Sequence, residues 1–277
     1  MMNIVLCGDK NMYVGMELVI YSLLTHNKNC NIYVLTGDIS VIDTKKRERK
    51  DYYGLDDTCK RTLHRIVTYL DKPGSSICFI DAVPYYEEYL KDSINFKTGF
   101  TPYAGLRLII DKAIPEIDDC LYLDCDTAIQ GDISYVYHEY IQRDQAFYAS
   151  YAEKACDGEG EMISGVMLMN IRLMEKLDIF NKARFNYNHI EYKYPDQMAL
   201  RDTYEAGRLP ESYGFIYDLA TCNYNPLILH FTNQLKTKIY SSNPYNINSK
   251  IYFYRKYPQL KYVQKGVEML MSIPFIE

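Results

Sequence analysis

Two aspartates separated by one residue follow an apolar stretch in the middle of the chain. The stretch is Leu121-Tyr122-Leu123, and it leads directly into Asp124 and Asp126. Two carboxylates about 5 Å apart repel each other by roughly 3 kcal/mol at an effective dielectric constant of 20. A divalent cation would offset this repulsion, and carboxylate oxygens suit Mg²⁺ or Mn²⁺. The alternative is a solvated turn that Asp126 caps.

An aspartate pair after an apolar strand also begins the nucleophile motif of haloacid-dehalogenase phosphatases. That motif places a threonine four residues after its first aspartate, where this chain has Ala128, and Thr127 comes one residue too early. The expected strand also lies in mid-chain, with helices before it. The sequence therefore favours a cation site over a phosphatase nucleophile.

Short apolar runs alternate with amphipathic segments around this pair, and such runs predict strands and helices respectively. The expected strands are 3–8, 31–36, 75–82, 120–124, 161–171 and 227–231. The expected helices are 12–27, 103–114, 173–189 and 194–207, and the charged segment 43–54 is interpreted as a solvated helix face. This alternation predicts an α/β domain with a mainly parallel, doubly wound sheet flanked by helices.

Ligands of such sheets bind beyond the carboxyl ends of the strands. Asp9 follows the first expected strand and Asp124 follows the fourth, so both are expected at this edge. No Pro/Ser-rich linker and no repeat divides the chain. One compact domain with a helical C-terminal subregion is therefore expected.

Composition narrows the class of protein. The 277 residues carry a net charge of −5, which disfavours nucleic acid as a partner because nucleic-acid binding needs a basic face. The eight cysteines include no C-x-x-C pair, as is typical of free thiols in a reducing compartment. The sequence begins without a signal-peptide pattern, and its longest apolar segment contains Glu17. A cytoplasmic protein is expected.

The segment LYLDCDTAIQGDIS (121–134) resembles the YLD-x-D-x-x-x-x-GD block of glycosyltransferase family 8. This family of retaining enzymes includes bacterial lipopolysaccharide galactosyl- and glucosyltransferases and glycogenin. Further segments are similar to the family's other blocks, in the same order: NIVLCGDKNM (3–12), RLIIDKAIPEIDD (107–119), SGVMLMNI (164–171), YPDQMAL (194–200) and LHFTNQLK (229–236). The resemblance implies a GT-A fold.

The resemblance also implies a set of site residues. Mn²⁺ or Mg²⁺ would be held by Asp124, Asp126 and His230. The implied catalytic residues are Asp196, Gln197 and Arg107. The implied residues for binding the nucleotide and its cation are Cys7, Asp9, Asn11, Arg107, Asp124, Cys125, Asp126, Asn233 and Lys236.

Several of these residues have ordinary interpretations when the resemblance is set aside. His230 ends an apolar run and would be a core histidine, and Lys236 would be a surface lysine. Arg107 would be solvated or ion-paired. Asp196 beside Pro195 would be a helix N-cap.

The chain departs from the family pattern on the sugar and phosphate side. Ile163 replaces an asparagine, Met198 replaces a frequent second acid and Asn233 replaces a glycine. Thr237-Lys238 stand in place of Pro-Trp, and Met12 stands where an aromatic residue often lies over the uracil. Metal and nucleotide binding are thus better indicated than a particular sugar.

The function implied is retaining transfer of glucose or galactose from a UDP-sugar to an acceptor hydroxyl, on lipopolysaccharide or another cell-surface glycan. The alternative is a metal-dependent UDP-sugar-binding protein with weak or lost transfer. The glycosyltransferase domain is expected over 1–235, with a nucleotide-binding half at 1–130 and a sugar and acceptor half at 131–235. The basic, tyrosine-rich extension 236–277 either docks on anionic membrane lipid or packs on the domain.

Overall fold

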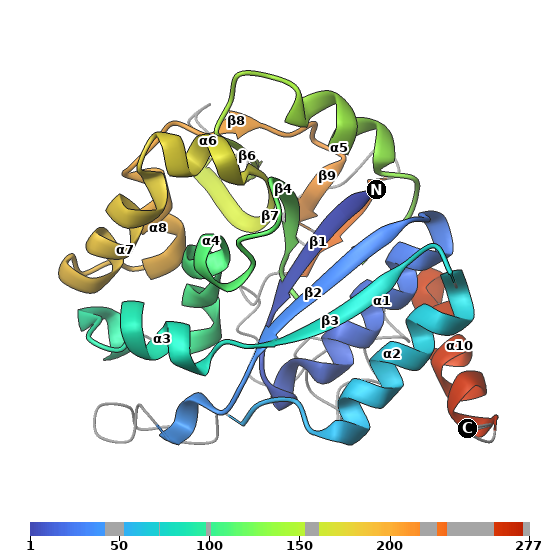
Figure 1. Ribbon diagram of the computed structural model, residues 1–277. Coiled ribbons are helices and arrows are strands. Elements are labelled where there is room, and N and C mark those ends of the chain that lie inside the picture. The colour runs from blue at the N-terminus through green and yellow to red at the C-terminus, as the bar shows by residue number, and fades with distance from the viewer. Residues whose placement is uncertain are drawn as a thin grey trace.

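A seven-stranded sheet forms the centre of the computed structural model, with the strand order β3-β2-β1-β4-β7-β6-β8 (Figure 1). The structure describes residues 1–41, 53–71, 73–97, 101–152, 161–216, 226–231 and 258–273. The strands are β1 (Met2–Cys7), β2 (Cys30–Thr36), β3 (Ser76–Asp81), β4 (Asp119–Leu123), β6 (Phe147–Ala152), β7 (Glu161–Asn170) and β8 (Gly207–Arg208). β3, β2, β1 and β4 run parallel, and β7 is antiparallel to β4 and β6. The predicted mainly parallel α/β sheet is confirmed.

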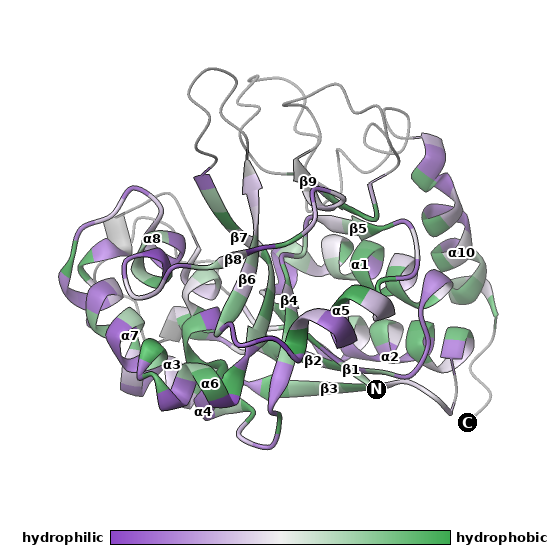
Figure 2. Cartoon of the chain, turned by 90° about the horizontal axis from the view of Figure 1, so that it is seen from above, coloured by the Kyte–Doolittle hydropathy of each residue, from purple (hydrophilic) through white to green (hydrophobic). Residues whose placement is uncertain are grey.

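The central strands are apolar because both of their faces are covered. In β1, Ile4 and Leu6 pack into one core cluster while Val5 and Cys7 pack into the other. Successive side chains of a strand point to opposite faces, so a strand buried on both sides reads as a continuous apolar run. Figure 2 shows this hydrophobic sheet between two layers of helices.

Helices cover both faces of the sheet (Figure 1). The cluster on one face includes residues of α1 (Tyr13–His26), α2 (Asp57–Asp71), α5 (Ser134–Ile141) and α10 (Lys261–Ser272). The cluster on the other includes residues of α3 (Val83–Tyr89), α4 (Ile110–Ala113), α6 (Ile171–Lys176), α7 (Ile179–His189) and α8 (Pro195–Arg201). No helix in the described ranges is long and apolar enough to span a bilayer.

A second sheet of three strands lies beside the end of β4. It contains β5 (Thr127–Ile129), β10 (Ile228–His230) and β9 (Tyr213–Ile216), in the order β5-β10-β9. β10 is antiparallel to β5, and His230 stands opposite Thr127. This pairing carries a residue from late in the sequence to the aspartate pair.

Several expected elements differ in detail. The segment expected as a helix over 103–114 forms a 3₁₀ helix, η4 (Pro102–Ile109), followed by α4. Most side chains of η4 are buried, so packing on several sides sets its backbone rather than one amphipathic face. Gly105 permits close approach, because a Cβ atom there would lie 2.9 Å from the hydroxyl of Tyr187.

The second half shows similar corrections. The helix expected over 173–189 divides into α6 and α7 at Asp178, whose φ of 59° is left-handed. The helix expected over 194–207 ends at Arg201, and Gly207 begins β8. β6 was not expected. Most of the charged segment 43–54 lies outside the described residues.

Part of the C-terminal extension packs on the domain. In α10, Val263, Val267 and Leu270 are buried in the same cluster as α1. The ring of Tyr262 lies 6.2 Å from that of Tyr21, centroid to centroid. For the helix Lys261–Ser272 the packed arrangement therefore holds, whereas residues 236–257 lie outside the described part of the chain.

Candidate active site

The aspartate pair lies in a tight turn at the carboxyl end of β4. The amide N–H of Asp124 donates to Gly165 O of β7 at 2.7 Å. Both the amide and the hydroxyl of Thr127 donate to Asp124 O, at 3.2 and 2.9 Å. The turn is therefore tied to the main sheet on one side and leads into the small sheet on the other.

The small sheet brings His230 to this turn. Besides the β5–β10 pairing, the N–H of Phe231 donates to Asp126 O at 2.8 Å. His230 Nε2 lies 3.2 Å from Asp126 Oδ1 and 3.6 Å from Asp124 Oδ2. One ligand atom from each of the three residues lies within 4.8 Å of the other two. Within the part of the chain that the structure describes, no other such group of metal-ligating side chains occurs.

Three observations show that these residues fit a divalent cation. Asp126 Oδ1 is buried and makes no hydrogen bond, although His230 Nε2 is only 3.2 Å away. Gly165 lets His230 and Asp124 converge against the backbone of β7, since a Cβ atom would lie 2.1 Å from His230 Cε1 and 2.7 Å from Asp124 Oδ2. Two carboxylates and one imidazole are also a donor set that Mn²⁺ and Mg²⁺ accept.

Electrostatics at the three ligands also favour a cation. Burial raises the pKa of Asp126 despite the nearby His230. Burial alone would also raise the pKa of Asp124, but Arg107 and His230 outweigh it and hold that pKa below its ordinary value. Burial alone would lower the pKa of His230, yet Asp126 and Asp124 raise it to about 9. The proton on His230 thus balances the charge of the carboxylates, and a bound cation would replace that proton while neutral His230 becomes a ligand.

Arg107 is buried behind the ligands and joins two carboxylates. Its side chain is 4% exposed, with Nη2 at 2.8 Å from Asp124 Oδ1 and Nε at 3.1 Å from Asp196 Oδ2. Its Cζ lies 4.4 Å from the centroid of the Tyr122 ring. This position agrees with the ion-paired interpretation of Arg107, and direct contact with the donor stays a prediction.

Ser164 connects Arg107 with the start of α8. Arg107 Nη1 donates to Ser164 O at 2.6 Å and to Ser164 Oγ at 2.7 Å. The Ser164 hydroxyl in turn donates to Asp196 Oδ2 at 3.2 Å. The backbone N–H of Ser164 donates to Gln197 Oε1, also at 3.2 Å. Asp196 lies in the first turn of α8 and is not its N-cap, which is Tyr194.

An irregularity of β7 explains why Ser164 faces these groups. The β6–β7 register passes from Ser150 opposite Ile163 to Ala149 opposite Met167. Residues 164–166 consequently have no partner on β6. Such bulges redirect side chains and are common beside active sites.

Residues 3–237 match the sequence pattern of the family described as Glycosyl transferase family 8. The chain belongs to this family. No curated protein matches the chain. Among solved structures, the fold is similar to the galactosyltransferase LgtC in complex with donor and acceptor sugar analogs, with TM-score 0.67 and 16% identity over 99% of this chain and 98% of that one. The family predicted from the sequence is confirmed.

Two further structures share the fold. The bifunctional glycosyltransferase WbbM has TM-score 0.64 and 15% identity, and the match covers 83% of this chain but only 45% of WbbM. Mouse xyloside xylosyltransferase 1 has TM-score 0.60 and 10% identity, over 83% of this chain and 96% of that one. These similarities support the GT-A fold of this family 8 member.

The nucleotide-loop residues expected in a family 8 protein lie at the ends of β1 and β4. Asp9 is 2% exposed and accepts hydrogen bonds from the N–H groups of Asn11 and Met12, at 3.0 and 3.2 Å, which caps the 3₁₀ helix η1 (Lys10–Met12). The Cys125 thiol donates to Cys7 O at 3.4 Å, so the aspartate turn is also attached to β1. Their contacts with a nucleotide stay predictions.

Three residues near the site were not predicted from the sequence, and two predicted residues lie outside the described part of the chain. The residues not predicted are Tyr122, Ser164 and Gly165. All three occur inside segments that resemble the family, and this position was the one signal in the sequence that could have indicated them. Asn233 and Lys236 lie outside the described residues.

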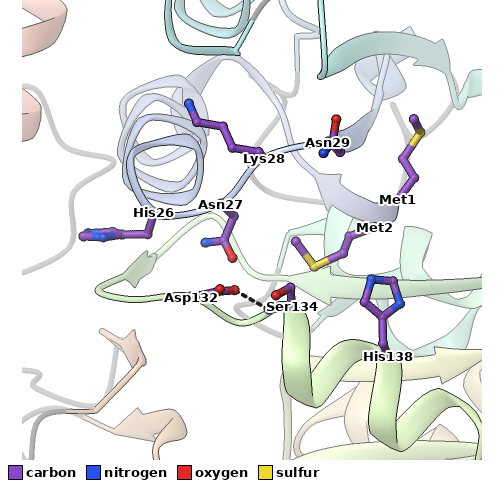
Figure 3. Close-up of a pocket in the computed structure, with 9 residues that line it drawn as sticks. All are labelled: Met1, Met2, His26, Asn27, Lys28, Asn29, Asp132, Ser134 and His138. Carbon is purple, nitrogen blue, oxygen red and sulfur yellow. Dashed lines mark hydrogen bonds between the residues drawn. The ribbon is translucent and has the colours of Figure 1, made fainter.

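A separate hollow of about 360 Å³ lies near the start of β1, at the amino end of the parallel strands (Figure 3). Its lining includes His26, Asp132 and His138, and the N–H of Ser134 donates to Asp132 Oδ1 at 2.8 Å. The ligand atoms of these residues do not converge as those of the aspartate pair and His230 do. The candidate active site is therefore at the carboxyl end of the sheet.

Proposed function

We propose that this family 8 member transfers a hexose, glucose or galactose, from a UDP-sugar to an acceptor hydroxyl with retention, and that transfer depends on Mn²⁺ or Mg²⁺. The observation that carries the proposal is the convergence of Asp124, Asp126 and His230, which the missing side chain of Gly165 permits. Residues 1–130 would bind the nucleotide, and residues 131–235 the donor sugar and the acceptor.

Asp124, Asp126 and His230 would hold the cation at the sheet edge. There it would supply positive charge where negative charge develops on the diphosphate as the bond to the anomeric carbon breaks. Arg107 keeps Asp124 ionised and fixed, and it acts on the donor through the two carboxylates that it contacts. In this proposal Lys236 and Asn233 complete the diphosphate site.

Asp196 and Gln197 are proposed to position the donor sugar. Gln197 is partly exposed, and because its Oε1 is held by the N–H of Ser164, its amide NH₂ is free to orient toward a sugar hydroxyl. Asp196 is 6% exposed, and its Oδ2 is held by Arg107 and by the hydroxyl of Ser164. A double displacement would need an accessible carboxylate nucleophile here.

These contacts favour reaction on one face of the sugar. The bond from the anomeric carbon to UDP breaks, and the bond to the acceptor oxygen forms on the same side. The leaving phosphate oxygen takes the proton of the acceptor hydroxyl. No general base from the protein is needed, because the phosphate is already placed beside that proton.

The second candidate function is metal-dependent UDP-sugar binding with weak or lost transfer. It is favoured by the apolar residues on the sugar side. Ile163 is 8% exposed and precedes Ser164, where the family has an asparagine. Met198 packs against a core cluster where the family often has an acid. Fewer polar groups are then available to strengthen contacts in the transition state.

The acceptor is proposed to be lipopolysaccharide or another cell-surface glycan or glycolipid. Transfer would take place on the cytoplasmic side of the membrane. Within the extension 236–277, α10 is packed on α1, so lipid contact would come from the basic, tyrosine-rich residues 236–257. Nucleic acid is not proposed as a partner, given the net charge of −5.

The test combines a binding assay with a turnover assay on the full chain. UDP with Mn²⁺ should raise the melting temperature by several degrees, and UDP with a chelator should not. UDP should then be released from UDP-glucose or UDP-galactose, faster with glycan acceptors. Metal-dependent binding without any UDP release would favour the second function. If UDP with Mn²⁺ does not shift the melting temperature, and Asp124→Asn changes neither UDP binding nor UDP release, both functions are wrong.

A further inference from the structure

Tyr122 is the fully buried neighbour of the first metal ligand. It is 1% exposed, and its hydroxyl donates to Asp124 Oδ1 at 2.8 Å. Its ring lies under Arg107, whose Nη2 donates to the same oxygen, also at 2.8 Å. Asp124 Oδ1 thus accepts two hydrogen bonds from groups that are themselves buried.

These two donors give the carboxylate of Asp124 one orientation. Arg107 cannot turn easily, because its Nε also donates to Ala104 O at 2.9 Å and its Nη1 to Ser164. With Oδ1 held from two sides, Oδ2 is the oxygen that faces His230, at 3.6 Å from Nε2. A ligand oriented before binding loses less conformational freedom when the cation arrives.

A phenol suits this position better than a second cationic side chain. Arg107 already supplies one positive charge to Asp124. A second positive charge would compete directly with the cation for the same carboxylate. The Tyr122 hydroxyl orients the Asp124 carboxylate through a hydrogen bond and adds no charge, since an ordinary phenol is neutral at physiological pH.

We propose that Tyr122 is a positioning residue that fixes the orientation of Asp124 and thereby sets the affinity of the site for its divalent cation. The inference rests on the metal dependence in the proposed function. It concerns this chain's own residues and not the identity of the sugar. Partners that orient metal ligands in this way typically contribute 10–100-fold to metal affinity.

The test compares Tyr122→Phe with a matched control, Tyr137→Phe. Tyr137 is likewise buried, at 3% exposure, and its hydroxyl donates to the carboxylate of Asp119. Asp119 begins β4, whereas Asp124 follows its end, so the control removes the same kind of hydrogen bond at the opposite end of the strand. Mn²⁺ is titrated into each full chain, with and without UDP, and the free ion is followed by electron paramagnetic resonance.

Tyr122→Phe should raise the dissociation constant for Mn²⁺ about tenfold, and Tyr137→Phe should leave it unchanged. UDP binding by Tyr122→Phe should be weak at limiting Mn²⁺ and recover at saturating Mn²⁺, which general damage to the fold would not produce. Equal Mn²⁺ affinity in Tyr122→Phe and wild type, or equal losses in the two variants, would overturn the inference. If wild type binds no Mn²⁺ even with UDP, the metal-dependent function fails together with it.

A second measurement keeps the hydroxyl in place and does not depend on the stability of Tyr122→Phe. 3-Fluorotyrosine is introduced at position 122 or 137, and its ¹⁹F resonance is followed during titration with diamagnetic Mg²⁺ and UDP. The resonance at position 122 should move along the binding curve, and that at position 137 should not. A resonance at 122 that stays fixed through saturation contradicts the proposed role.

Discussion

Gly165 lies directly against the imidazole of His230. A Cβ atom at this glycine would be 2.1 Å from His230 Cε1 and 2.6 Å from Nε2, far inside van der Waals contact. The imidazole is buried and its strand is paired on both sides, so it cannot simply move away. His230 can therefore lie this close to the backbone of β7, and so within reach of Asp124 and Asp126, only because residue 165 has no side chain.

Gly165→Ala should consequently remove Mn²⁺-dependent UDP binding. The added methyl group should also lower the free energy of unfolding by about 1–3 kcal/mol, as overpacking generally does. The check is the melting temperature with and without Mn²⁺ and UDP. Wild type should be stabilised by several degrees and the variant by none.

Gly207→Ala is the matched control, because its Cβ atom would lie 2.4 Å from Tyr148 Cδ1, away from the three ligands. It should lower the melting temperature but keep the shift produced by Mn²⁺ and UDP. A Gly165→Ala protein that keeps the full shift would show that the space beside His230 is not the cation site.

Arg107→Met should be strongly destabilising and should also weaken metal-dependent UDP binding. The substitution leaves the carboxylates of Asp124 and Asp196 without their shared counter-ion, at 2.8 and 3.1 Å. Breaking a buried ion pair by removing one partner costs about 3–5 kcal/mol. Urea unfolding measures the loss of stability, and Mn²⁺ titration of the folded fraction measures the loss of affinity.

Arg184→Met separates these two effects. The side chain of Arg184 is as buried as that of Arg107, and its Nη1 lies 2.6 Å from Asp111 Oδ1, in a pair that contains none of the predicted ligands. A comparable loss of stability with unchanged Mn²⁺ and UDP binding is expected. If Arg184→Met weakens binding as much as Arg107→Met does, Arg107 has no specific role at the site.

Thiol reactivity tests the burial of β2, which contains Cys30, and of α2, which contains Cys59. Burial raises the pKa of Cys30 to about 12 and that of Cys59 to about 11. Because a raised pKa lowers the thiolate fraction, both thiols should be almost entirely protonated, and slow to alkylate, at pH 8. Iodoacetamide followed by peptide mass mapping should label the exposed Cys78 before Cys30 and Cys59, and should label all three once urea unfolds the chain. Rapid labelling of Cys30 in the native protein would contradict its place in the core.

β1, which leads to Asp9, and β4, which leads to the aspartate pair, could be predicted because the signal for each strand is local in the sequence. β1 and β4 are buried on both faces, so each appears as an apolar run, and the acids mark its end. His230 has no comparable local signal. Its approach to Asp126 depends on the pairing of β10 with β5, and only the family resemblance indicated it.

The features that escaped prediction are set by tertiary packing. The sequence left Arg107 either solvated or ion-paired, and the choice between the two depends on the packing of η4 on several sides, which buries the side chain against Asp124. The direction of Ser164 follows from the β6–β7 register shift, which depends on residues of both strands. Neither the hydrophobic periodicity of these segments nor the family motifs that contain them show which way the side chains of Arg107 and Ser164 point.

Ser164→Ala should separate binding from transfer. The hydroxyl accepts from Arg107 at 2.7 Å and donates to Asp196 at 3.2 Å, and neither partner is one of the three proposed metal ligands. Loss of a hydrogen bond to a buried charged group costs about 1.5–3 kcal/mol. Here the lost bond is one of those that orient the Asp196 carboxylate. UDP release from the preferred UDP-hexose should slow by roughly tenfold or more, since 1.4 kcal/mol corresponds to a factor of ten. Mn²⁺-dependent UDP binding should be nearly unchanged.

Ser22→Ala is the control for Ser164→Ala. Ser22 is also fully buried, and its hydroxyl donates to Val19 O and accepts from the N–H of Ile129, remote from Asp196. Its loss should lower stability without slowing UDP release. Equal rates for Ser164→Ala and wild type would show that Asp196 needs no support from Ser164. A loss of Mn²⁺-dependent UDP binding in Ser164→Ala would instead mean that this serine acts on the metal ligands, through Arg107 and Asp124.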